Sequence, residues 1–113
     1  MSKKKYLRKN EFKYNMHPDV VRKDGKGHVS YVSAKQGHKA KINVITHSPK
    51  FIGETTYPLK QNPDRTSSYK TQSYFSKPVW QSDVYLSTPK NGYWKLSKAD
   101  KKSIKKVNKK FKK

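Results

Sequence analysis

The centre of the chain carries the pattern of two paired β-strands. Residues 28–33 are β-branched and aromatic, and residues 41–44 alternate polar and apolar side chains, with the apolar ones on one buried face. The connection, residues 34–40, is polar and contains Gly37, which can adopt a positive φ without steric cost. The pattern therefore predicts a β-hairpin over residues 28–46.

One amphipathic helix is predicted over residues 97–111. Ser97 is a favourable N-cap, and Asp100 follows three residues later, as in a capping box. Lysines cover most of the remaining helix surface. A narrow apolar stripe at i, i+3 and i+7 is formed by Ile104, Val107 and Phe111.

Short strands are predicted between these two elements, because prolines interrupt every longer apolar stretch. Residues 51–52, 55–57 and 69–75 suit such strands, and Asn91-Gly92 is a favourable hairpin dipeptide. About five short strands with one terminal helix predict a mainly β (α+β) fold, a small half-open barrel with the helix packed against it. We expect a basic N-terminal arm over residues 1–27, a β core over 28–96, and a lysine-rich helix and tail over 97–113.

Charge identifies the class of partner. The chain has 28 Lys+Arg against 7 Asp+Glu, a net charge of +21 over 113 residues, so self-repulsion opposes compaction unless an acidic partner binds. Nucleic acid is the partner expected first, because phosphate neutralisation releases counterions. Only three of the basic residues are arginines, which favours backbone contacts over base reading. The chain has no cysteine and no apolar run long enough to span a membrane, so we expect a cytoplasmic protein.

Candidate catalytic residues lie at the open end of the predicted hairpin. His28 begins its first strand and His47 follows its second, directly after Thr46. A metal-independent ribonuclease needs a general base, a general acid and cations, which histidine and lysine can supply. The alternative is that His28 and His47 are ordinary strand-end residues. The acidic residues are too scattered for a two-metal site, and we expect neither a metal nor another cofactor.

Aromatic residues alternate with lysines, as in proteins that bind single strands. We expect Trp80, Tyr85 and Trp94 to build the core, and Tyr69 and Tyr74 to be exposed. The residues predicted to contact nucleic acid are Lys26, Lys35, Lys39, Lys41, Arg65, Tyr69, Lys70, Tyr74, Lys102, Lys106 and Lys109.

Two stretches resemble the MazF/PemK-type toxin endoribonucleases. Residues 41–48, followed by Pro58-Leu59, resemble the family strand that ends in a threonine-serine element, and residues 94–100 resemble the leucine-serine start of its C-terminal helix. The resemblance implies an SH3-like barrel, RNA cleavage without metal, a homodimer and an acidic antitoxin as partner. Thr46 would take the family's threonine role. The family's arginine and proline before this strand are absent, so Lys26 or His28 would replace the arginine.

Three functions fit these observations. The first is a toxin-like endoribonuclease that acts on RNA. The second is a non-enzymatic nucleic-acid-binding protein, such as an accessory or ribosome-associated factor. The third is an inhibitor that binds an acidic surface on a nucleic-acid enzyme. The aromatic residues favour RNA or single strands over duplex DNA. In addition, the predicted helix is almost entirely lysine on its polar surface and does not present base-reading side chains to a duplex.

Overall fold

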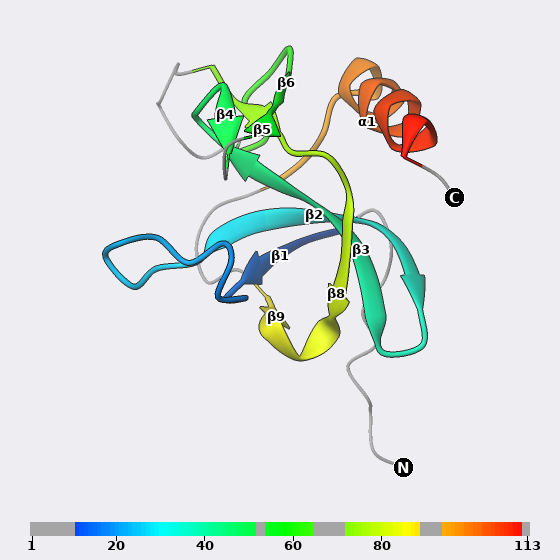
Figure 1. Ribbon diagram of the computed structural model, residues 1–113. Helices are drawn as coiled ribbons and strands as arrows, with labels where there is room; N and C mark the ends of the chain where they lie inside the picture. Colours follow the sequence, from blue (N-terminus) through cyan, green and yellow to red (C-terminus); the bar gives the residue numbers. More distant parts are fainter. Residues whose placement is uncertain (1–10, 52–53, 65–71, 89–93, 112–113) are drawn as a thin grey trace.

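The fold is mainly β, with one C-terminal helix. A computed structural model describes residues 11–51, 54–64, 72–88 and 94–111 (Figure 1). The main sheet contains β1 (Glu11–Asn15), β2 (His28–Gln36), β3 (Lys39–Thr46), β6 (Tyr57–Pro58), β7 (Tyr74–Phe75), β8 (Val79–Ser82) and β9 (Leu86–Ser87). The helices are the 3-10 helix η1 (Asp83–Tyr85) and α1 (Lys98–Lys110). This seven-stranded antiparallel sheet has the order β6-β7-β3-β2-β1-β9, and β8 also pairs with β3. Over the described residues, the sheet does not close into a barrel. A separate two-stranded sheet joins β4 (Lys50–Phe51) to β5 (Glu54–Thr55).

The predicted hairpin is confirmed as β2 and β3, with a tighter turn than expected. Gly37 has a φ of 61°, and the turn consists of Gly37 and His38 alone. The remainder of the predicted connection, residues 34–36 and 39–40, continues the two strands. A bulge between Val32 and Ala34 shifts the register, which lets this polar sequence keep pairing.

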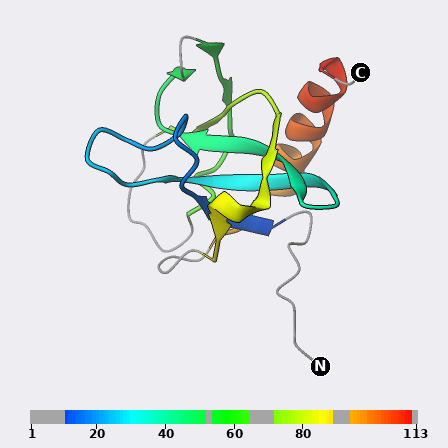
Figure 2. The ribbon, with the colours of Figure 1, turned by 60° about the horizontal axis from the view of Figure 1, so that its bottom comes forward.

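The N-terminal segment contributes a strand to the sheet, which differs from the predicted boundary at residue 27. All five residues of β1 pair with β2, from Glu11 opposite Val32 to Asn15 opposite His28. Residues 11–15 are therefore part of the β structure and not of an arm. The loop between β1 and β2 projects away from α1 in both Figure 1 and Figure 2.

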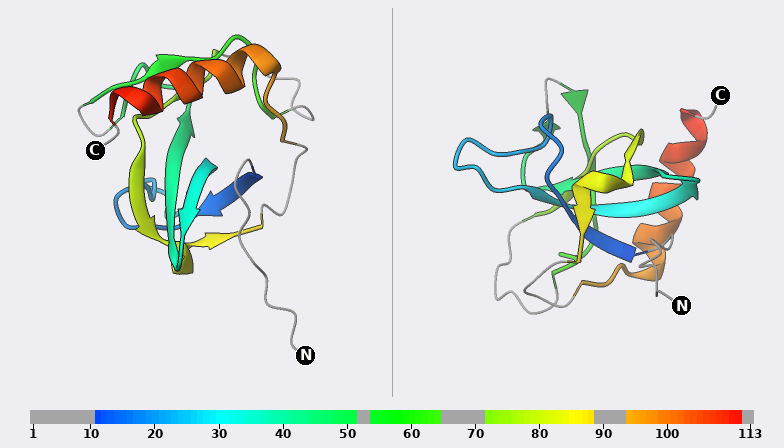
Figure 3. Two further views of the ribbon diagram at one scale, coloured as in Figure 1. Left: turned by 90° about the vertical axis from the view of Figure 1, so that its right-hand side faces the viewer. Right: turned by 90° about the horizontal axis from the view of Figure 1, so that it is seen from below.

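The sheet curls because its two outer strands, β8 and β9, follow each other in the chain. η1 connects them, and its ends are fastened to neighbouring segments. Asp83 N donates to His38 O at 2.8 Å, and Met16 N donates to Tyr85 O at 2.9 Å. Figure 3 (left) shows β8 and β9 wrapping around β2 and β3, with α1 crossing above. The curl brings β8 against β1, where Gln81 Nε2 donates to Asn15 Oδ1 at 2.9 Å.

β3 separates two apolar clusters, because its alternate side chains face opposite sides. Ile42 and Val44, predicted for the buried face, are 0% and 1% exposed and pack with Val20 and Val32. Ile45 lies in the other cluster, on the helix side. That cluster comprises Tyr31, Ile45, Leu59, Phe75, Leu96, Ile104 and Val107. The hairpin is thus covered on both faces, which the alternating pattern of residues 41–44 did not indicate.

The helix has the predicted N-cap, Ser97, but the Asp100 carboxylate does not complete a capping box. The Ser97 hydroxyl accepts from Asp100 N at 3.1 Å, and Ile104 and Val107 are buried. Phe111, the third residue of the predicted stripe, is 39% exposed at the C-cap. The Asp100 carboxylate accepts from Lys60 N at 2.8 Å and Gln61 N at 3.1 Å. This buried carboxylate therefore fastens the first turn of α1 to the segment after β6.

Replacing Asn108 by alanine is expected to lower the free energy of unfolding by about 1–3 kcal/mol. Asn43 Nδ2 donates to Asn108 Oδ1 at 2.9 Å, and both residues are buried. The alanine would leave a buried Asn43 donor without this partner. Urea unfolding of the variant measures the loss. Lys106→Ala, at an exposed position of the same helix, is the control and should change stability by less than about 0.5 kcal/mol. Equal losses of unfolding free energy in both variants would show that the hydrogen bond between Asn43 and Asn108 does not stabilise the fold.

Candidate nucleic-acid interface

A lysine-lined groove runs between α1 and the β2–β3 hairpin. Its volume is about 530 Å³, and its polar floor contains Tyr31, Ser33 and Asn108. No acidic side chain lines the groove in the described part of the chain. Five lysines line it: Lys41, Lys101, Lys102, Lys105 and Lys109. We refer to this feature as the lysine groove.

The helical repeat places three of these lysines in one row. Lys101, Lys105 and Lys109 are spaced at i, i+4 and i+8, so they are neighbours along one flank of α1. Ile104 and Val107 turn the adjacent face toward the sheet, which holds that flank beside β3. Like charges at this spacing repel one another. A bound anion would relieve the repulsion, so the row favours a ligand with several negative charges.

The groove floor provides neutral polar groups. Burial raises the pKa of the Tyr31 hydroxyl above its usual value, so the phenol stays protonated at physiological pH. The Ser33 hydroxyl donates to Asn43 Oδ1 at 3.0 Å, next to the Asn43–Asn108 contact. These internal hydrogen bonds keep the floor rigid. The positive charge of the groove comes entirely from its rim.

The lysines predicted to bind nucleic acid are only partly gathered in the groove. Lys41, Lys102 and Lys109 line it, whereas Lys106, on the same helix, does not. Lys26 and Lys39 are exposed and Lys35 is half-buried, all outside the lining. Tyr74 was expected to be exposed and is half-buried on β7. Arg65, Tyr69 and Lys70 lie outside the described residues.

The prediction missed Lys101 and Lys105, which complete the row on α1. The sequence did contain a signal for them, because the spacing of Lys101, Lys105 and Lys109 places them beside the apolar stripe. Which flank of the stripe faces β3 depends on tertiary packing, so sequence alone could not select this row over the one that contains Lys106.

The three candidate catalytic residues have different surroundings. His28 Nδ1 lies 2.6 Å from Val20 O, and this imidazole is half-buried. Thr46 is buried, and its Oγ1 accepts from Ser48 N at 3.2 Å. His47 is exposed, with Nδ1 3.5 Å from Ser73 Oγ. These contacts tie the two imidazoles to separate partners. Of the three side chains, His47 is the one most accessible to a substrate.

The expectation that Trp80 and Tyr85 build the core is wrong. Trp80 is 46% exposed and Tyr85 is 36% exposed. Trp80 belongs to β8, which has a pairing partner on one side only, and Tyr85 belongs to η1 outside the sheet. Trp94 is half-buried and packs on Phe12 with ring centroids 5.6 Å apart. Two large aromatic surfaces are thus available to a ligand.

Comparison with known proteins gives no relative for this chain: no family model, curated protein or solved structure matches it. In the described ranges, α1 is too short and too polar to cross a membrane, and no other α-helix is present.

Proposed function

We propose that this protein binds nucleic acid, with a preference for single-stranded RNA, through the lysine groove. The observation that carries the proposal is the gathering of five lysines without an acidic residue in the described lining. Lysine is a point charge that suits phosphate oxygens and does not read bases by bidentate contacts. The groove would therefore hold the phosphate backbone irrespective of sequence. Exposed aromatic side chains such as Trp80 favour a strand whose bases are unpaired.

A binding experiment on the purified protein tests this proposal. The protein is freed of cellular nucleic acid by nuclease and high salt, and fluorescence anisotropy follows labelled strands of about 16 nucleotides, within the range of single-strand site sizes. We expect single-stranded RNA to bind more tightly than duplex DNA of the same sequence. Failure to bind any strand at low salt would refute the proposal. Sequencing the nucleic acid that co-purifies with the protein would identify its natural ligand.

A second candidate function is metal-independent cleavage of RNA, as the resemblance to MazF/PemK-type toxins suggests. The observation that favours it is the exposed imidazole of His47 beside the Ser73 hydroxyl, at the end of β3. The finer fold proposed with this function is an SH3-like half-open barrel, in which Thr46 takes the family's threonine role. An acidic antitoxin-like protein would then cover the lysine groove, the active form would be a homodimer, and the site of action would be the cytoplasm.

If the protein is a ribonuclease of this kind, it should cleave RNA in the presence of EDTA. His47→Ala should slow cleavage at least about 100-fold, because a general acid or base would be lost. His38→Ala is the matched control, because His38 is also exposed but lies at the opposite end of β3. Gel analysis of product lengths over time measures both rates. Intact RNA after prolonged incubation with the parent protein would exclude the enzyme and leave the binding protein.

An inhibitor of a nucleic-acid enzyme is the remaining alternative, since the lysine groove would equally accept an acidic protein surface. Affinity capture from a nuclease-treated lysate distinguishes the inhibitor from the nucleic-acid-binding protein. A protein retained after nucleic acid is removed would support the inhibitor, whereas loss of all captured proteins would support nucleic acid as the direct ligand.

A further inference from the structure

A second cavity lies on the opposite face of β3 from the lysine groove. Its volume is about 270 Å³, just below the usual range of small-ligand sites. Val20, Val44 and Val79 give it apolar walls, and the half-exposed Trp80 contributes to its lining. Its polar lining includes His17, in the loop after β1, and Gln81, on β8, together with Asp19, Thr55, Thr56, Ser76 and Lys77. Apolar walls with polar groups at defined positions are typical of small-ligand sites.

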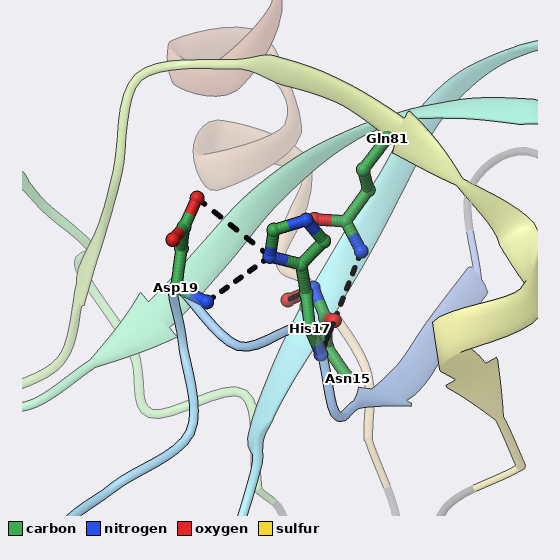
Figure 4. A network of polar contacts seen from close by, with 5 residues as sticks. Asn15, His17, Asp19 and Gln81 are labelled. Carbon is green, nitrogen blue, oxygen red and sulfur yellow. Dashed lines mark hydrogen bonds and ion pairs between the residues drawn. The ribbon is translucent and has the colours of Figure 1, made fainter.

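The surroundings of His17 determine which ring nitrogen carries the proton in the neutral imidazole. Asp19 N donates to His17 Nδ1 at 3.1 Å, so Nδ1 is the acceptor and the proton resides on Nε2. The Asp19 carboxylate lies 3.7 Å from the same Nδ1 atom. Tyr85 packs edge-on against the ring, with centroids 4.7 Å apart, which fixes the ring plane. Figure 4 shows Nδ1 turned toward Asp19. Nε2–H is therefore a hydrogen-bond donor with a set orientation.

A hydrogen-bond chain likewise fixes the amide orientation of Gln81. His17 N donates to the Asn15 side chain at 2.9 Å, and because a backbone N–H can only donate, the atom it meets is Oδ1. Gln81 Nε2 donates to the same Asn15 Oδ1 at 2.9 Å (Figure 4). The Gln81 nitrogen is thus committed to Asn15. Its Oε1 is left as an acceptor.

Neither His17 Nε2 nor Gln81 Oε1 has a hydrogen-bond partner among the described residues. Every buried side-chain nitrogen or oxygen in those residues does have a partner, so these two atoms reach solvent-accessible space. Both side chains line the cavity. Among the polar groups of the lining, His17 Nε2 and Gln81 Oε1 are thus a donor and an acceptor whose polarity the fold sets in advance.

We propose that this cavity binds one unpaired nucleobase of the strand held in the lysine groove, an inference that rests on the proposed function. Each of the four RNA bases has an acceptor next to a donor on one edge. The acceptor would receive the hydrogen bond of His17 Nε2–H, and the donor would give one to Gln81 Oε1. Apolar walls would cover the base faces. β3 supplies Lys41 to the groove and Val44 to the cavity, about 10 Å apart along the strand but on opposite faces, so the RNA would pass around the sheet and several nucleotides would separate the two contacts.

Anisotropy with two RNA strands of equal length and charge tests the inference, one with all its bases and one abasic throughout. We expect the parent protein to bind the intact strand about tenfold more tightly, as one enclosed base contributes. Val79→Phe fills the cavity from a position that is 41% exposed, and Gln81→Met removes the acceptor at similar volume, together with the donor to Asn15. Both variants should lose most of the tenfold difference. Val84→Phe is the matched control, because Val84 is 76% exposed and outside the cavity lining, and it should keep that difference.

The two proposals fail in different ways. If the parent protein binds intact and abasic strands equally, the cavity does not hold a base, whereas the lysine groove still binds the backbone. If neither strand binds, both proposals fail. If Val79→Phe and Gln81→Met keep the tenfold difference in affinity between the two strands, the proposal that the cavity binds a base is also refuted. Binding of a free nucleoside monophosphate to a protein that does not distinguish the strands would assign the cavity to a free nucleotide, against this inference.

Discussion

Asp100→Ala is expected to lower the free energy of unfolding by about 3 kcal/mol, since two hydrogen bonds to a charged group are lost. Asp100 is 1% exposed, and its carboxylate accepts from the backbone amides of Lys60 and Gln61. Alanine leaves both amides without this acceptor and leaves a small void. The helix would lose its main polar attachment to the segment after β6.

Urea unfolding followed by far-ultraviolet circular dichroism measures this loss. Asp24→Ala is the control, because Asp24 also accepts from a backbone amide, that of Lys26, but its side chain is 45% exposed. Water can replace an exposed acceptor, so the control should lose less than about 1 kcal/mol. A loss at Asp100 no greater than at Asp24 would show that the buried carboxylate does not anchor α1.

The triple variant Lys102→Glu, Lys105→Glu and Lys109→Glu is expected to bind single-stranded RNA at least about 100-fold more weakly at low salt. Each substitution removes an attraction to phosphate and adds a repulsion. All three side chains line the lysine groove from one flank of α1. The variant keeps the apolar residues by which the helix packs against the sheet.

Lys23→Glu, Lys50→Glu and Lys98→Glu together form a control with the same change in net charge. These lysines are exposed and do not line the groove. If the groove is the binding site, this control should lose far less affinity than the groove variant. Equal losses would mean that RNA responds only to total charge and that the groove has no special role.

Elements that depend on local sequence could be predicted, whereas those that depend on long-range pairing could not. Gly37 indicated the turn of the hairpin, and Ser97 with Asp100 indicated the start of α1. Phe12 and Tyr14 alternate with polar residues, which suits an extended segment, but the pairing of this segment with β2 depends on residues far along the chain. The curl of the sheet depends on contacts such as Gln81 with Asn15, which are 66 residues apart.

The candidate site was predictable in composition but not in geometry. Lysine content predicts a polyanionic ligand, and three of the lysines predicted to contact it, Lys41, Lys102 and Lys109, line the groove. Their assembly requires a particular flank of α1 to face β3, which Ile104 and Val107 decide through packing. The second cavity had no signal in the sequence, since His17 and Gln81 meet only through the chain of hydrogen bonds at Asn15.

The salt dependence of RNA binding tests the lysine groove most directly. For the parent protein, the logarithm of the affinity should fall linearly with the logarithm of salt concentration, by about 0.7 for each phosphate neutralised on a single strand. If the three reversed lysines each contact a phosphate, the slope of the groove variant should be shallower by about 2. The matched charge control should keep a slope close to that of the parent protein. Identical slopes for the parent protein and the groove variant would contradict phosphate binding in the lysine groove.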